Sequence, residues 1–183
     1  MDAEVNIAVT ILEARWKSDL PSTAVMARRA ARAVLAAEMP ARLRRAARDR
    51  PVELNLVLVD DKTMRRLNRD YRRIDKPTNV LSFGGPEDWR AGAAGLPIVL
   101  GDVVLARETV AAEAAAQGKS MADHTRHLIV HGVLHLLGHE HQRPSQAAKM
   151  ESVEIGVLAE LGIANPYWVD SRKPTPARAP RRR

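Results

Sequence analysis

Three histidines with the spacing of ligands for a single metal ion are the clearest chemical feature of this chain. His131 and His135 lie four residues apart, so a helix would place both imidazoles on one face. Gly138 permits a left-handed turn, which would end that helix and bring His141 back to the same point. Three imidazoles without a thiolate suit Zn²⁺ and leave a fourth coordination position open, as in catalytic zinc sites. The spacing therefore predicts one zinc ion held by His131, His135 and His141.

The residue after the first histidine separates this pattern from that of the zinc peptidases. In peptidases with a helical His-Glu-x-x-His followed by Gly and a third His, the Glu is the general base. Gly132 occupies that position in this chain and has no side chain. The sequence thus keeps the metal ligands and lacks the peptidase base, which argues against a peptidase.

Several polar residues near the three histidines have more than one possible role. His124 and His127 lie on the same helical stripe, where they either pack as ordinary half-buried residues or support a ligand from behind. His139 is expected to face solvent. Glu140 is either a solvated acid or a group that orients a ligand or a water molecule. The general base therefore stays unassigned at this level.

Length and composition predict one domain with its own core. The chain has 183 residues and no cysteine, which excludes disulfides and thiolate metal sites and favours a reducing, cytoplasmic location. The early apolar stretch Val5–Leu12 is broken by Asn6 and Thr10, so we expect neither a signal peptide nor a membrane span. We expect one domain over residues 1–169 and a disordered tail over residues 170–183, which contains three prolines and six basic residues.

The net charge of +7 is concentrated in a few segments, of which Lys62–Lys76 is the most informative. Arg65, Arg69, Arg72 and Lys76 repeat there at helical spacings, so they form either one basic face or an ordinary solvated helix surface. Clustered aromatic residues, on which bases of RNA would stack, are lacking in the sequence. A bound nucleic acid would therefore be held mainly through its phosphates, with marked salt dependence.

Hydrophobic periodicity predicts an α+β domain, with one mixed four-stranded sheet and helices packed over it. Strands are expected over residues 5–11, 52–59, 79–83 and 98–106, the last interrupted at Gly101-Asp102. Helices are expected from Ser22 or Thr23 to Met39, from Asp60 or Asp61 to before Pro77 with Tyr71 facing inward, and over residues 108–117, 121–137 and 146–161. Residues 84–97 are expected to form a mobile loop, and the basic stretch Arg42–Arg50 the exposed end of a helix. The helix over residues 121–137 is apolar on nearly every side, so it predicts a buried, rigid support for the metal site in the C-terminal half.

Three stretches carry a resemblance to a known family. They are residues 67–83 (LNRDYRRIDKPTNVLSF), 100–106 (LGDVVLA) and 127–141 (HLIVHGVLHLLGHEH). In this order they resemble the YbeY endoribonucleases, bacterial factors of ribosomal RNA maturation, over about residues 5–169. The three-histidine pattern alone is moderately specific, and the upstream Tyr71-Arg72 and PTNVLSF motifs make the combination strong.

The resemblance implies a cytoplasmic, zinc-containing endoribonuclease that cleaves single-stranded RNA. It also implies maturation of the 3′ end of 16S (small-subunit) ribosomal RNA, ribosome quality control and the small ribosomal subunit as partner. His131, His135 and His141 match the family's metal ligands, and Arg72 matches an arginine essential for function in the family. Glu140 stands where an Asp is common and Gly84 where a Pro is usual, and neither departure replaces a proposed ligand.

The mechanism expected from these residues is metal-assisted cleavage of an RNA phosphodiester, with Arg72 pairing with the phosphate. The alternative for Arg72 is a plain surface arginine. A ribosome-assembly factor with structural zinc is a second interpretation of the whole chain, and a fourth protein ligand on the metal would favour it. A third is a zinc hydrolase of another substrate class, which predicts an acid near the metal and a neutral or acidic cleft.

Overall fold

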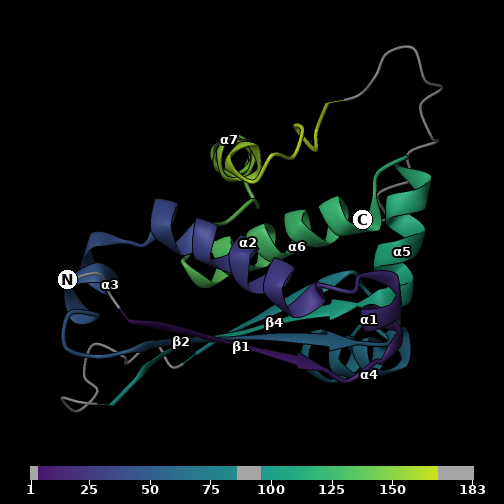
Figure 1. Ribbon diagram of the computed structural model, residues 1–183, viewed down its shortest axis with the longest axis horizontal. Coiled ribbons are helices and arrows are strands. Elements are labelled where there is room, and N and C mark those ends of the chain that lie inside the picture. The colour runs from purple at the N-terminus through teal and green to yellow at the C-terminus, as the bar shows by residue number, and fades with distance from the viewer. Residues whose placement is uncertain (1–3, 86–95, 169–183) are drawn as a thin grey trace.

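Four strands form one mixed sheet in the computed structural model, which describes residues 4–85 and 96–168 (Figure 1). The strands are β1 (Val5–Ile11), β2 (Val52–Val59), β3 (Val80–Gly84) and β4 (Ile98–Ala106). Their order in the sheet is β1-β2-β4-β3, with β1, β2 and β4 parallel and β3 antiparallel to β4 at one edge. The predicted α+β class and the mixed four-stranded sheet are confirmed.

Seven helices accompany the sheet within the described residues. They are α1 (Arg15–Asp19), α2 (Thr23–Glu38), α3 (Ala41–Ala46), α4 (Asp61–Arg72), α5 (Arg107–Ala116), α6 (Met121–Leu136) and α7 (Pro144–Glu160). The five longer helices lie where the sequence predicts them. Their ends differ from the predicted ends by at most two residues, except that α4 ends at Arg72, several residues before Pro77. The short helix α1 was not predicted, and α3 is a separate six-residue helix where the exposed end of a helix was expected. Ser22, the residue before α2, makes no side-chain capping bond.

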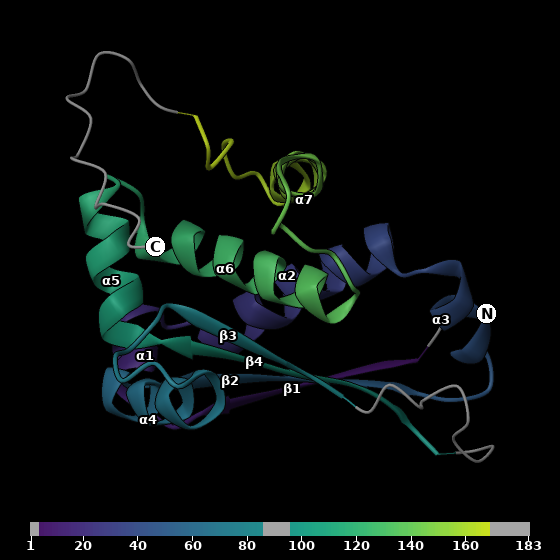
Figure 2. The same ribbon diagram turned by 180° about the vertical axis from the view of Figure 1, so that it is seen from behind.

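The two faces of the sheet pack against different helices, and the alternation of side chains along the strands decides which. In β2, Leu54, Leu56 and Leu58 join the main core with residues of α2 and α6. Val57 and Val59 belong instead to a smaller cluster with Met64 of α4. Figures 1 and 2 show α4 alone on one side of the sheet, α2 and α6 on the other, and α7 outside them as a further layer. Helix α6, which carries the predicted ligands His131 and His135, is thus held between the sheet and α7.

Helix α6 lies unusually close to the sheet at Gly132. A β carbon at this position would lie 2.5 Å from Val103 Cγ1, a distance that real β carbons do not show. Ser82 of β3 reinforces the approach, because its Oγ donates to the Gly132 carbonyl at 3.0 Å. The helix begins at a side-chain cap, since Ser120 Oγ accepts from the Asp123 backbone N–H at 3.0 Å. These contacts hold α6 against β3 and β4.

Two details of the predicted elements are wrong. Tyr71 points outward, with 69% of its surface exposed, and its ring meets Phe83 edge-on at a centroid distance of 4.8 Å. The buried residues of α4 are Met64 and Asn68, so the inward face of the helix stops one turn before Tyr71. Strand β4 is continuous, and its register with β2 shifts at Leu100, which has no partner there, beside Gly101 with a φ of 126°. Most of the expected mobile loop and the whole tail after residue 169 lie outside the described residues.

Candidate active site

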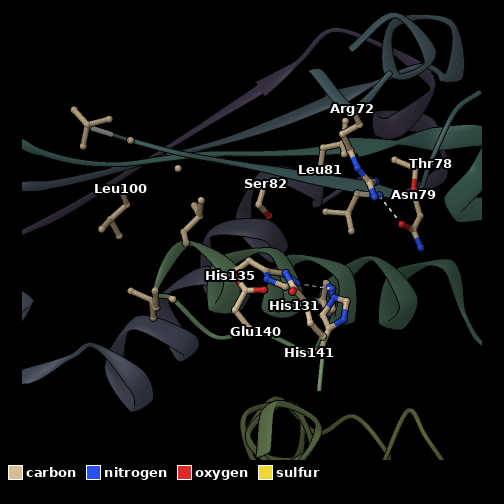
Figure 3. A pocket seen from close by; sticks show the side chains of 18 of the residues that line it. Arg72, Thr78, Asn79, Leu81, Ser82, Leu100, His131, His135, Glu140 and His141 are labelled. Atoms are coloured by element: carbon tan, nitrogen blue, oxygen red, sulfur yellow. Dashed lines mark hydrogen bonds between the residues drawn. The ribbon is translucent and has the colours of Figure 1, made fainter. Parts of the chain in front are cut away.

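The three predicted metal ligands meet at the C-terminal end of α6. His131 Nε2 and His135 Nε2 are 3.1 Å apart, and one ligand atom from each of His131, His135 and His141 lies within 4.8 Å of the others. Two ligand nitrogens on a tetrahedral zinc ion, each about 2.0–2.1 Å from the metal, are separated by about 3.3 Å. The imidazole donors and the distance between His131 and His135 therefore suit one metal ion such as zinc, and Figure 3 shows the three rings grouped together.

The turn after α6 brings His141 to the pair. Gly138 adopts a φ of 93°, which the sequence predicts for a glycine that ends the helix. Its N–H donates to the His135 carbonyl at 2.9 Å, and the N–H of His139 donates to the Leu134 carbonyl at 3.0 Å. The ring centroid of His141 then lies 4.9 Å from that of His135 and 5.4 Å from that of His131.

The surroundings of His135 favour the neutral imidazole that a metal ligand requires. Burial lowers the pKa of His135, and the neighbouring His131 and His141 lower it further. Glu140, which is exposed beside the histidines, acts in the opposite direction on the same pKa. The balance disfavours a proton on His135, so the ligand nitrogen is kept available.

Glu154 of α7 was not predicted from the sequence, yet it contacts one of the three predicted ligands. This carboxylate is fully buried, and its Oε1 lies 2.7 Å from His131 Nδ1. Burial alone would raise the pKa of Glu154, but hydrogen bonds from His127, His131 and Tyr167 lower it to about 2. The sequence contained one sign of this buried acid. Glu154 lies four residues from both Met150 and Leu158, so it falls on the apolar face of its helix.

Arg72 lies at the last residue of α4, and the turn that follows it is well fixed. Arg73 adopts the left-handed conformation with a φ of 61°, and Asn68 Nδ2 donates to the Lys76 carbonyl at 2.8 Å. The Arg72 side chain lines a cavity of about 1210 Å³ whose other wall contains the three histidines (Figure 3). The structure therefore brings the predicted arginine and the predicted ligands to one cavity.

The rest of the predicted basic stripe does not join Arg72. Arg65 is paired with Asp75 at 2.7 Å, and Arg69 with Asp70 at 3.0 Å, all on exposed surface. Arg42 of α3 instead lines the same cavity as Arg72, although the sequence indicated only the exposed end of a helix there. Glu140 also lines this cavity and is the single carboxylate among its described lining residues.

The remaining histidines have distinct partners. His127 Nε2 lies 3.2 Å from Glu154 Oε2, so His127 shares this carboxylate with His131. His124 is buried and its Nε2 lies 2.9 Å from Glu113 of α5, away from the three ligands. His139 was expected to face solvent, which is wrong: its side chain is largely covered and lies 3.5 Å from Glu38.

The molecule is an α+β protein with a candidate metal centre. Its three converging imidazoles lie on the wall of a cavity that also contains two arginines, which suits an anionic substrate. The sequence profile described as "Endoribonuclease YbeY" matches residues 19–162. The chain belongs to the YbeY endoribonuclease family.

Known relatives cover nearly the whole chain. "Endoribonuclease YbeY" of Paramagnetospirillum magneticum is 48% identical over 169 residues, which are 91% of this chain and 98% of the relative. The protein of the same name from Rhodospirillum rubrum is 45% identical over 180 residues, 94% of this chain and 86% of the relative. The solution structure of TM1509 from Thermotoga maritima shares the fold, with a TM-score of 0.50 at 20% sequence identity. The match covers 92% of this chain and 100% of TM1509. None of the described helices is long and apolar enough to cross a bilayer.

Proposed function

We propose that this protein is a single-strand-specific metallo-endoribonuclease that uses zinc at His131, His135 and His141 and matures the 3′ end of 16S ribosomal RNA. One observation carries the proposal: three converging imidazoles and the Arg72 guanidinium line the same cavity. The names of the relatives support RNA as the substrate. The proposed location is the cytoplasm, where the small ribosomal subunit would be the partner.

The chain's own residues have clear tasks in such a reaction. A bound zinc ion supplies Lewis acidity, which polarises a phosphoryl oxygen and makes water a stronger acid. Arg72 would pair with two oxygens of the same phosphate through its planar guanidinium and oppose the charge that gathers in the transition state. Arg42, on the wall of the same cavity, would hold a neighbouring phosphate and so align the strand across the histidines.

The geometry favours this proposal over the two alternatives. Among the residues that the structure describes, the group of ligand atoms contains three histidines and no fourth protein ligand, which a structural zinc site would use. The close packing of Gly132 against Val103 leaves no room for the glutamate that a zinc peptidase places there. Glu140 meets one expectation of a zinc hydrolase of another class, an acid near the histidines, but two arginines on the cavity wall suit a polyanion better than a neutral peptide.

Purified Arg72→Ala and His135→Ala variants, assayed on single-stranded and duplex RNA with metal content measured in parallel, test the proposal. We expect Arg72→Ala to keep its zinc and lose about 10²–10³-fold in cleavage rate, because it removes one donor to the transition state. His135→Ala should lose both zinc and activity. Arg69→Ala, which removes an arginine of the same helix that is paired away from the cavity, is the matched control. Cleavage that persists in metal-free His135→Ala would contradict the proposal.

The ends of the RNA product identify the nucleophile. Attack by the 2′-hydroxyl leaves a cyclic phosphate, whereas attack by water does not. Glu140 is the carboxylate placed to accept a proton in the second case, because it lines the cavity beside the histidines (Figure 3). We therefore expect Glu140→Gln to slow cleavage with retained zinc if the products carry no cyclic phosphate, and mass spectrometry of the products decides between the two routes.

A further inference from the structure

Glu154 is a fully buried carboxylate whose two oxygens are both engaged, yet it does not line the substrate cavity. Its Oε1 lies 2.7 Å from His131 Nδ1. Its Oε2 accepts from the Tyr167 hydroxyl and lies 3.2 Å from His127 Nε2. A buried charge costs free energy unless it is well paired, so such complete pairing shows that the carboxylate is built into the fold around His131.

The contact determines which nitrogen of His131 carries its proton. An ionised carboxylate only accepts hydrogen bonds, so His131 Nδ1 must be the donor. The lone pair of a neutral His131 then lies on Nε2, the atom that is 3.1 Å from His135 Nε2. The hydrogen bond to Glu154 therefore selects the form of His131 that can bind a metal and fixes the direction of its ring.

Three segments meet at this carboxylate. Glu154 comes from α7, His127 and His131 lie one turn apart on α6, and Tyr167 comes from the segment that follows α7. Tyr167 also lies 3.3 Å from His127 Nε2, so the tyrosine and the histidine together hold Oε2 while Oε1 faces the metal ligand. The position of the carboxylate is thus set independently of the cavity that would receive RNA.

We propose that Glu154 is the positioning residue of the metal centre: it holds His131 in the metal-binding tautomer and orientation, and Tyr167 and His127 hold Glu154 in turn. The inference rests on the proposed metal site and adds to it a residue that acts through a ligand. It predicts that metal affinity, measured without RNA, depends on a side chain that touches neither metal nor substrate. Loss of a hydrogen-bond partner behind a metal ligand typically costs 10–100-fold in affinity.

Zinc affinity of the full-length chain, measured by competition with a chromophoric chelator, tests the inference. We expect Glu154→Ala to bind zinc 10–100-fold more weakly than the unchanged protein. Glu154→Gln should recover part of this loss, because its amide oxygen can still accept from His131 Nδ1. Glu160→Gln removes one exposed charge from the same helix and should bind zinc with unchanged affinity. Equal zinc affinity in all four proteins would overturn the inference.

A second measurement separates positioning from general damage to the fold. In the metal-free protein, nitrogen-15 chemical shifts of the His131 ring should report a proton on Nδ1, and in Glu154→Ala they should report a shift toward protonation of Nε2. The same result in Glu154→Gln as in the unchanged protein would agree with its partial rescue. An Nε2-protonated His131 in the unchanged protein would contradict the inference. Because neither readout uses RNA, failure of the nuclease proposal would appear separately, as tight zinc binding without cleavage.

Discussion

At Gly132, the packing of a single residue excludes the general base of a zinc peptidase. It occupies the place of the general base in zinc peptidases, but its Cα faces Val103 and Ser82 on the sheet. A side chain there would have to displace either the side chain of Val103 or the helix that carries His131 and His135. The missing base thus reflects the close packing of helix on sheet that holds the ligands in place.

Replacing Gly132 with alanine should destabilise the protein in spite of alanine's better helix propensity. The new methyl group would lie 2.5 Å from Val103 Cγ1, and such overpacking typically costs about 1–3 kcal/mol. Alanine gains up to about 1 kcal/mol over glycine inside a helix, so we expect a net loss of about 1–2 kcal/mol in the free energy of unfolding. Urea denaturation measures this change.

Gly156→Ala is the matched control for that experiment. Gly156 is exposed on α7, and a β carbon there meets no atom within 4 Å. The same substitution should therefore stabilise the protein by about 0.5–1 kcal/mol. A stabilising effect at both positions would show that Gly132 is not tightly packed.

At the scale of elements, the site depends on short segments that bring residues to it from outside α6. Helix α3 has only six residues, yet it places Arg42 on the cavity wall that the histidines share. Helix α4 contributes Arg72 only through its last residue, from the far side of the sheet (Figures 1 and 3). The substrate-binding part of the site is therefore distributed over several elements, whereas the ligands lie in one continuous segment.

Arg42→Ala should weaken binding of single-stranded RNA and reduce its dependence on salt. One lost phosphate contact lowers the slope of log affinity against log salt concentration by about 0.7 for a single strand. Zinc content should not change. Arg45→Ala on the same helix removes an arginine outside the lining of the cavity and should leave the slope unchanged. Fluorescence anisotropy with a labelled oligonucleotide at several salt concentrations gives both slopes.

Glu113 of α5 makes a pH-sensitive contact with α6 and with Asn79, the residue before β3. Its Oε2 lies 2.9 Å from His124 Nε2 and accepts from Asn79 Nδ2 at 2.9 Å. Burial raises the pKa of Glu113, but these two hydrogen bonds outweigh burial and lower it below its ordinary value of 4.5. The folded state therefore releases this proton more readily than the unfolded state, so the contact stabilises above about pH 4.5 and is lost as the pH falls.

Glu113→Gln should accordingly lower the free energy of unfolding at pH 7 by about 1–2 kcal/mol. This is the lower end of the range for a hydrogen bond to a charged group, because the Glu113 side chain is partly exposed. The difference from the unchanged protein should narrow as the pH drops below 4.5. Denaturation curves between pH 7 and pH 3 provide the comparison. A difference that stayed constant across this range would mean that the charge of Glu113 does not contribute.

What the sequence predicted correctly and what it missed can be traced to the range of the interactions involved. Local patterns located β1, β2, β4 and α6, because strand alternation and helix spacing act over a few residues. They also located the three histidines, whose convergence needs only one helix and the turn at Gly138. Glu154, Tyr167 and Arg42 were missed because each reaches the site through tertiary packing. Tyr71 was placed inward because helical spacing alone does not show where the sheet beneath α4 ends.

At the scale of the whole molecule, the proposed metal centre lies where α6 and α7 meet, so a bound metal should couple the two helices. Glu154 of α7 touches a ligand of α6, and the chain between the helices supplies His141. A metal that binds this arrangement and not the unfolded chain stabilises the folded state by mass action. The candidate site is therefore also an expected source of stability.

Zinc should raise the melting temperature of the protein by about 5–10 °C when it is present at 100 times its dissociation constant. This range follows from a stabilisation of about 2.7 kcal/mol and a shift of about 2–4 °C per kcal/mol for a domain of this size. Differential scanning calorimetry with zinc and with a chelator measures the shift. His135→Ala should melt at the same temperature under both conditions.

The order of these parts along the polypeptide has a consequence for biosynthesis. Arg72 leaves the ribosome well before His131, and His141, Glu154 and Tyr167 follow in that order. A nascent polypeptide that has folded only as far as α6 presents two imidazoles to the ion, without the third and without the carboxylate that orients the first. We therefore expect the proposed metal centre to assemble only after α7 and Tyr167 have been synthesised, so a shorter nascent polypeptide should bind the metal more weakly.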